Sequence, residues 1–189
     1  MSLFGRPSVV ALSARRAPYL RLFVFTVALL TAQLAAAAPV EARAHPFLWP
    51  TTGRITQGFG CTGFWAEPRY GSCRHFHNGI DIANRRGTPI YAAASGRIKI
   101  LGWDPWYHDR DWLILINNGH GFKTLYAHMK PEQLRGIRRG RYVRQGQLIG
   151  HMSDTGRATG VHLHWGVYHY GRPVDPANFL EPGARLKRH

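Results

Sequence analysis

The sequence predicts an all-β fold that is mainly antiparallel and contains minimal helix. Short apolar stretches alternate with turn signals between residues 45 and 180. Glycine (21 residues) and proline (12 residues) are frequent, and both interrupt long regular elements. Long runs of helix-forming residues are scarce. These three observations favour many short strands over a helical architecture.

The first 44 residues have the composition of a secretory signal peptide followed by a short segment. Four arginines among the first 21 residues precede an apolar run at 22–30, and small residues follow as far as 38. Cleavage after Ala37 and cleavage after Ala44 both fit this pattern. A membrane anchor is the less favoured alternative, because the run is near the lower length limit for a span and is rich in alanine. We therefore expect export to the periplasm, the cell wall or the medium.

Strand-forming segments follow one another from residue 54, separated by turn signals such as Asn118-Gly119. We expect strands at 54–59, 79–83, 89–101, 111–117, 122–129, 142–149 and 162–170. A single helical turn is expected near 131–134. These elements form one domain at 45–180, and residues 181–189 form a basic C-terminal tail.

The chain contains two cysteines, Cys61 and Cys73, both after the signal. In an exported protein such a pair predicts one disulfide bond, which stabilises by about 2–3 kcal/mol for a short loop. Their spacing excludes a CxxC redox motif. The enclosed loop carries Phe64, Trp65 and Tyr70. It is either a wall of a substrate groove or a cover over the core, and the sequence leaves both open.

The chain remains strongly basic without its signal. From residue 45 onward, 20 Lys and Arg stand against 9 Asp and Glu, a net charge of +11. Nucleic acid is the first partner that such a charge suggests. In an exported protein, however, anionic polymers of the cell envelope are the expected partners and nucleic acid is not. A basic surface exposed to solvent without a specific partner is the alternative for most of these residues.

Three groups of polar residues stand out among the eleven histidines: His77 with Asp81, His162 with His164, and His128 at the end of a predicted strand. Side chains at i and i+2 of a strand project from one face, so His162 and His164 point together. One of the two can bind a metal ion while the other lies beside it. With His77 and Asp81 added, two imidazoles and a carboxylate then reach that ion. Three protein ligands leave a fourth position open, as in catalytic zinc sites.

Without the other two groups, His128 would be interpreted as a partly buried polar residue of a strand. The remaining histidines are expected to have structural or surface roles: His45, His75, His108, His120, His151, His169 and His189.

Several segments, taken in order, resemble the lysostaphin/LytM-type peptidoglycan endopeptidases from about residue 54 to residue 180. The matching motifs are QGFG at 57–60, HNGIDIA at 77–83, GTPIYAAASG at 87–96, LYAHM at 125–129, GQLIG at 146–150, TGRATG at 155–160 and HLH at 162–164. The resemblance implies a β-sandwich-like LytM fold with a surface groove. The segment between residues 60 and 77 and the glycine at position 166 depart from the family pattern.

The resemblance also implies roles for the matched residues. His77, Asp81 and His164 correspond to the ligands of one Zn²⁺ per chain. His128 and His162 correspond to two catalytic histidines that move protons beside the metal. The implied activity is that of a metalloendopeptidase that hydrolyses peptidoglycan cross-links or stem peptides, and we expect a monomer.

Two other functions are compatible with parts of this pattern. A non-catalytic LytM-type module could activate or scaffold cell-wall hydrolases, but such modules usually lack ligand residues that are all present here. A lipoyl-carrier-like β-sandwich is suggested by the glycine-rich strands near residues 96 and 146. It is disfavoured because no lysine lies in a tight hairpin between them.

Overall fold

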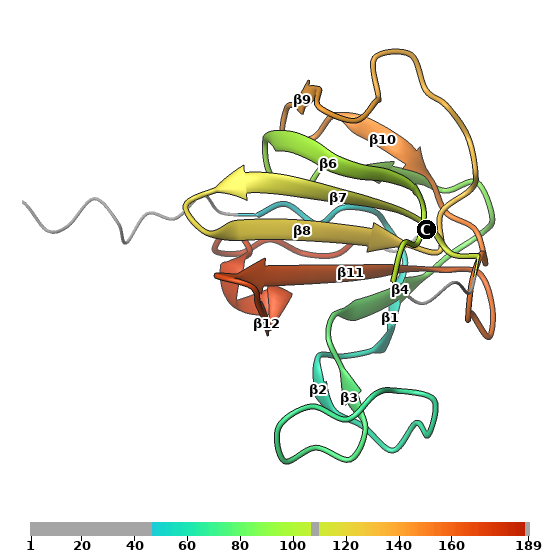
Figure 1. The fold of residues 1–189 in the computed structure, drawn as a ribbon, viewed down its shortest axis with the longest axis vertical. Coiled ribbons are helices and arrows are strands. Elements are labelled where there is room, and N and C mark those ends of the chain that lie inside the picture. The colour runs from blue at the N-terminus through green and yellow to red at the C-terminus, as the bar shows by residue number, and fades with distance from the viewer. Residues whose placement is uncertain (1–46, 107–109, 188–189) are drawn as a thin grey trace, which may run out of the picture. The chain divides into compact units, whose positions relative to one another are not determined.

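An eight-stranded antiparallel sheet forms the centre of the fold, with the strand order β1-β4-β11-β8-β7-β6-β9 and with β12 beside β11 (Figure 1). The computed structural model describes residues 47–106 and 110–187. Two smaller sheets pair β10 with β5 and β2 with β3. The strands are β1 (Arg54–Gln57), β2 (Gly60–Cys61), β3 (Phe76–His77), β4 (Ile80–Ala83), β5 (Pro89–Tyr91), β6 (Gly96–Trp103), β7 (Trp112–Gly119), β8 (Phe122–Ala127), β9 (Tyr142–Val143), β10 (Leu148–His151), β11 (His162–His169) and β12 (Arg172–Val174).

This architecture confirms the expected all-β, mainly antiparallel fold with minimal helix. The helix found in the described residues is a short 3-10 helix, η2 (Pro176–Phe179). The helical turn expected near 131–134 is wrong. The Lys130 backbone N–H donates to the His151 carbonyl (2.9 Å), and Glu132 binds the His151 ring (2.6 Å). These two contacts hold the segment along β10 in a non-helical conformation.

Two predicted strands are each divided in the structure. The segment 89–101 forms β5 and β6, because the backbone at residues 92–95 leaves the small sheet to join the large one. There the Ala93 N–H donates to the Tyr126 hydroxyl (2.7 Å) rather than to a strand. The segment 142–149 forms β9 and β10, separated by a turn at Gly146 (φ 74°). The short strands β2, β3 and β12 are absent from the prediction, since two or three residues show no period.

The central sheet buries one face under the main core and carries a smaller apolar cluster on the other. In β11 the alternation places Leu163, Trp165 and Val167 in the main core with no exposed surface. On the opposite face, Leu113 and Leu125 are buried with a neighbouring alanine and with partly buried side chains packed around them. The second face is therefore apolar at its centre and can form the floor of a binding site.

The predicted disulfide is confirmed. Cys61 and Cys73 are bonded, with 5.3 Å between their Cα atoms. The loop that they close extends from the β2–β3 pair, beyond the edge of the sheet where β1 and β4 lie (Figure 1). This loop, residues 61–73, is called the disulfide loop below.

The start and the end of the described chain lie together. The Phe47 N–H donates to the Phe179 carbonyl (2.7 Å), and Gly53 donates to the carbonyl of Lys187 (2.9 Å). The segment expected to be a signal peptide, residues 1–44, lies outside the described residues. Within the described residues no helix is long and apolar enough to cross a membrane.

Candidate metal centre

Three neighbouring strands bring His77, Asp81 and His164 together. Asp81 in β4 and His164 in β11 lie directly opposite each other in the antiparallel register. His77 is the last residue of β3, and a two-residue link carries the chain from there into β4. The His-x-His and His-x-x-x-Asp motifs, more than 80 residues apart in sequence, thus meet through the pairing of β4 with β11.

The link between His77 and Asp81 requires a glycine. A Cβ atom at Gly79 would lie 2.6 Å from the Trp165 carbonyl oxygen and 2.8 Å from the His164 ring. Since such distances are forbidden for carbon, a larger residue would push β3 away from β11. The glycine therefore permits the close approach on which the three-residue cluster depends.

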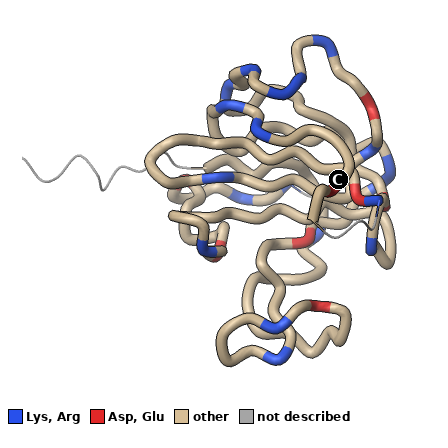
Figure 2. Tube along the Cα trace, in the orientation of Figure 1, with Lys and Arg blue, Asp and Glu red and all other residues tan. Residues whose placement is uncertain are grey.

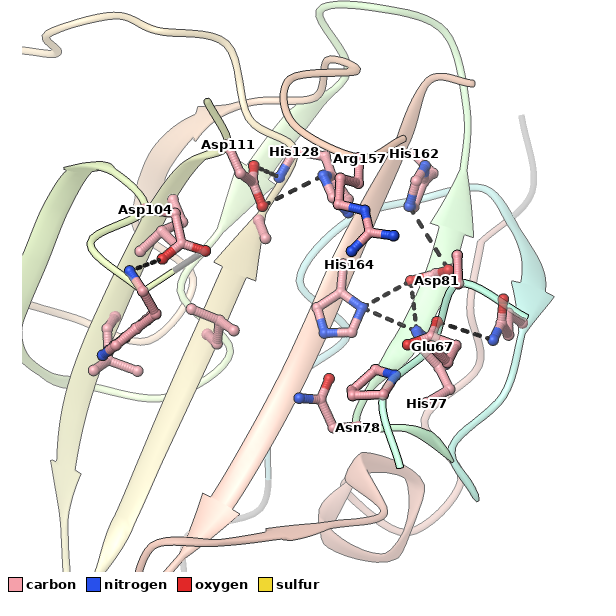
Figure 3. Close-up of a pocket in the computed structure, with 18 of the residues that line it drawn as sticks. Glu67, His77, Asn78, Asp81, Asp104, Asp111, His128, Arg157, His162 and His164 are labelled. Atoms are coloured by element: carbon pink, nitrogen blue, oxygen red, sulfur yellow. Dashed lines mark hydrogen bonds and ion pairs between the residues drawn. The ribbon is translucent and has the colours of Figure 1, made fainter. Parts of the chain in front are cut away.

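The potential ligand atoms of this cluster form a small triangle (Figure 3). His77 Nε2 lies 3.0 Å from Asp81 Oδ1 and 3.0 Å from His164 Nδ1. Asp81 Oδ1 is also 3.0 Å from His164 Nδ1. Among all histidine, cysteine and acidic side chains of the described residues, these three form the group whose atoms are close enough together to hold one metal ion.

The donor set of the cluster fits zinc. The His77 Nδ1–H donates to the Gly58 carbonyl (2.8 Å), which directs the Nε2 lone pair toward the cluster. Two imidazole nitrogens and one carboxylate oxygen are typical zinc ligands, and in a tetrahedral site such atoms lie about 3.3 Å apart. His77 is fully buried, whereas the Asp81 and His164 side chains keep 14% and 11% of their surface exposed. The cluster is therefore closed on the protein side and open toward solvent.

The charges of the cluster are coupled. Burial alone would raise the pKa of Asp81, but hydrogen bonds with His164 and His77 outweigh it, so the pKa of Asp81 is lowered. Burial lowers the pKa of His164. Burial opposes charge on His77 as well, yet the hydrogen bond and the charge of Asp81 raise the pKa of that ring. The carboxylate thus stays ionised, as a metal ligand must be.

His128 and His162 lie together at one side of the cluster. Their ring centroids are 4.5 Å apart, and the centroid of His128 is 6.2 Å from that of His164. His162 Nε2 is 3.7 Å from Asp81 Oδ2, and its Nδ1–H donates to the Gly160 carbonyl (2.9 Å). Burial lowers the pKa of His162. Outside the triangle, these two rings are thus near enough to move protons beside it.

Asp111 orients His128 and was missed in the sequence. Its Oδ1 accepts the His128 backbone N–H (2.7 Å), and its Oδ2 lies 3.4 Å from His128 Nδ1. The His128 ring also donates from Nδ1 to the Thr155 carbonyl (2.7 Å). Burial would lower the pKa of His128, but the hydrogen bond and charge of Asp111 raise it. An acidic residue at the start of the strand that pairs with the LYAHM strand was the available signal.

A cavity of about 630 Å³ contains the cluster and continues along the second face of the sheet. Leu113, Leu125 and Ala127 form its floor. Trp106 and Arg157 belong to its lining as well, and they come from different loops. This cavity corresponds to the surface groove that the family resemblance implies.

The disulfide loop forms part of the cavity wall through Phe64, Ala66, Glu67 and Pro68. Trp65 is not among the lining residues and is 77% exposed. Glu67 faces the metal cluster (Figure 3), and burial raises the pKa of its carboxyl. The loop therefore borders the groove, but through other side chains than the exposed tryptophan.

The remaining histidines have other contacts or lie outside the description. The His75 Nδ1–H donates to the Glu67 carbonyl (3.1 Å), and His169 stacks on the ring of Phe122 (4.1 Å between centroids). The ring of His151 is bound by Glu132, and none of these rings joins the metal cluster. Outside the described residues are His45, His108 and His189.

Comparison with known proteins places this geometry in a family context. The model of peptidase family M23 matches residues 75–176. The DD-carboxypeptidase/endopeptidase Mpg of Neisseria meningitidis is 38% identical over 111 residues, which cover 58% of this chain and 24% of that protein. The match thus spans about a quarter of the length of this relative.

Solved structures share the fold. A zinc containing peptidase from Vibrio cholerae has a TM-score of 0.57 and 29% identity, over 70% of this chain and 39% of that one. The catalytic domain of lysostaphin from Staphylococcus simulans has a TM-score of 0.55 and 26% identity, over 67% of this chain and 91% of that one. Both likenesses agree with the antiparallel sheet described above.

Proposed function

Since this chain belongs to peptidase family M23, we propose that it is a zinc-dependent endopeptidase that hydrolyses peptide bonds in the stem peptides and cross-links of peptidoglycan. The family membership and the likeness to lysostaphin confirm the resemblance inferred from the sequence motifs. The substrate in the proposal comes from that resemblance, and the reaction class comes from the family.

One observation carries the proposal: two imidazole nitrogens and a carboxylate oxygen converge, 3.0 Å from one another, at the wall of a cavity large enough for a peptide. His77, Asp81 and His164 would hold one zinc ion per chain. When bound, zinc lowers the pKa of a water molecule toward about 7 and polarises a carbonyl oxygen.

His162 and His128 divide the proton transfers between them. The Nδ1–H of His162 is held by Gly160, and burial lowers the pKa of the ring, so its Nε2 is a neutral base that accepts a proton from water. Asp111 raises the pKa of His128, so this ring is protonated more readily. His128 then donates a hydrogen bond from Nε2 to the oxyanion or a proton to the leaving amine.

The cellular setting belongs to the same proposal. The chain is exported through its N-terminal segment and acts in the cell envelope as a monomer. Its basic surface contacts anionic envelope polymers rather than nucleic acid. In Figure 2 lysines and arginines are spread over the described chain and gather around β9 and the neighbouring turns.

The test combines metal analysis with digestion of purified peptidoglycan. We expect one zinc per chain, loss of activity with chelators and recovery when zinc is returned. Replacing His77, Asp81 or His164 by Ala should abolish both zinc binding and cleavage, because two side chains do not hold the ion. Mass spectrometry of the released muropeptides identifies the bond that is cut.

Two results would contradict the proposal in different ways. Full cleavage by His164→Ala would remove the assigned metal site. Stoichiometric zinc with no product from peptidoglycan would instead favour the non-catalytic module that activates or scaffolds other hydrolases. His169→Ala is the matched control, because this histidine also lies in β11 but far from the cluster, and it should retain zinc and activity.

A further inference from the structure

Among the described residues, Lys123 and Arg157 are the lysine and arginine side chains that line the cavity. Lys123 is the second residue of β8, whereas His128 follows the end of that strand. Five residues of strand separate them by about 16 Å. Arg157 comes from the loop between β10 and β11, which carries the groups that hold His128 and His162. Of these two, Arg157 is therefore the cation next to the reacting groups.

The loop that carries Arg157 is held in place on the N-terminal side of this residue. Before it, the Thr155 hydroxyl donates to the Met129 carbonyl (2.9 Å), and the Thr155 carbonyl holds the His128 ring. At Gly156 (φ 73°) a Cβ atom would lie 2.5 Å from the Cβ of Asp111, so the backbone lies directly against that side chain. The arginine thus begins from a rigid base, one residue beyond this contact.

The guanidinium group is directed into the cavity on the side where His128 and His162 lie (Figure 3). None of the ion pairs among the described residues includes Arg157. The neighbouring carboxylate in the same loop, Asp154, is bound by Arg86. Arg157 is therefore an exposed cation, aimed at the reaction site and not neutralised by an ion pair within the described residues.

The chemistry of the group indicates its ligand. A guanidinium is planar and always charged, and it donates two parallel hydrogen bonds to a carboxylate. Stem peptides carry free carboxylates at their C-terminus and on the diamino acid that forms the cross-link. In both places the carboxylate can lie on the carbon that also bears the nitrogen of an amide bond.

We propose that Arg157 binds a free carboxylate on the leaving residue of the substrate, next to the bond that is cut. This inference rests on the proposed function and narrows its substrate. The enzyme prefers amide bonds whose nitrogen belongs to a residue with its own free carboxylate. Amide bonds inside an ordinary peptide, and cross-links in which that carboxylate is amidated, are poor substrates.

The test uses a synthetic cross-linked stem-peptide dimer in two forms. They differ only in whether the carboxylate on the carbon bearing the cross-linking nitrogen is free or is a carboxamide. The zinc-loaded wild-type enzyme should cut the free acid with a kcat/KM about 10- to 100-fold higher. In Arg157→Gln this preference should fall to about 2-fold or less, through loss on the acid, while cleavage of the carboxamide changes little. Arg157→Lys should restore part of the preference.

Lys123→Gln is the matched control, since it removes a cavity cation far from the reacting groups and should keep the wild-type preference. Equal losses on both dimers in Arg157→Gln would overturn the inference and indicate a structural role for the loop. Equal wild-type rates on both dimers would overturn it as well, with the proposed function intact. Failure of the zinc-loaded enzyme to release any product from peptidoglycan would be failure of the proposed function itself.

Discussion

At the scale of single residues, His128 and His162 are distinguished from the metal cluster by their neighbours. Both rings donate from Nδ1 to backbone carbonyls and lie outside the triangle of ligand atoms. His128→Ala and His162→Ala should therefore bind zinc normally and lose roughly 10²–10⁴-fold in turnover, because general acid–base catalysis contributes about that much. Zinc content and kcat are measured on the same samples. If His128→Ala lost as much zinc as His77→Ala, the division of roles would be wrong.

Asp111 leads to a prediction about pH. Asparagine at this position keeps the acceptor for the His128 backbone N–H but removes the negative charge that raises the pKa of His128. In Asp111→Asn the pKa of His128 therefore falls, and the limb of the kcat/KM profile that reports this ring moves to lower pH. Turnover should fall about 10- to 100-fold, since a hydrogen bond to a charged group contributes about 1.5–3 kcal/mol.

The control for this change is Asp104→Asn, because Asp104 also lines the cavity but accepts from the Trp106 N–H and not from the His128 backbone N–H. Its pH profile should match the wild type. An unshifted profile in Asp111→Asn, with turnover reduced at every pH, would show that Asp111 only supports the fold.

At the scale of elements, the disulfide loop is the part of the groove wall that departs from the family pattern. Phe64 lines the cavity, whereas Trp65 beside it is 77% exposed. Phe64→Ala should raise KM about 3- to 10-fold with zinc retained, because an aromatic contact with substrate is lost. Trp65→Ala, the neighbouring aromatic, should leave KM unchanged. Equal effects of the two substitutions would count against a wall formed by Phe64.

Removal of the disulfide distinguishes a role of the loop in stability from a role in substrate binding. Replacing Cys61 and Cys73 together by Ser should lower the free energy of unfolding by about 2–3 kcal/mol, because the unfolded chain gains freedom. If the loop shapes the groove, KM also rises at temperatures below the transition while zinc stays bound. A lower melting temperature with unchanged kinetics would mean that the loop stabilises the fold and does not take part in substrate binding.

At the scale of the whole molecule, basic residues gather around β9, at the end of the sheet order opposite β1 and β4 (Figure 2). Arg138, Arg139 and Arg141 are exposed there and form no ion pair with a described residue. Since β9 and β11 are four strand positions apart, this surface lies about 19 Å from the metal cluster. Replacing the three arginines by Gln should weaken binding to purified cell wall without changing turnover of a soluble peptide.

Salt provides the physical check on this surface. Between about 50 mM and 200 mM salt, wall binding of the wild type should fall, and that of the triple variant should change less, because exposed charges are screened over about 8–10 Å. A variant with Gln at Arg54, Arg69 and Arg74, exposed near the other edge, has the same net charge and is the control. Equal binding by the two triple variants would assign the effect to net charge alone.

What the sequence determined by itself is local. Strand periodicity placed His162 and His164 on one face with Leu163 buried opposite, and it predicted the all-β class from short segments and turns. Two cysteines in a chain that is expected to be exported predicted the disulfide. The ordered motifs identified the family, and with it the residues that the structure brings together. These inferences succeeded because each depends on neighbours within a few residues or on the order of motifs along the chain.

The tertiary structure decided what depends on pairing between distant strands. The register of β4 against β11 places Asp81 opposite His164. The close approach of β3 to β11 is possible because Gly79 has no side chain. The pairing of β7 with β8 brings Asp111 to His128. No periodicity or motif in the sequence predicts either contact. Each contact is stabilised only when strands that are distant along the chain pack against each other. Residue type limits what chemistry is possible, and packing selects which of the possible partners meet.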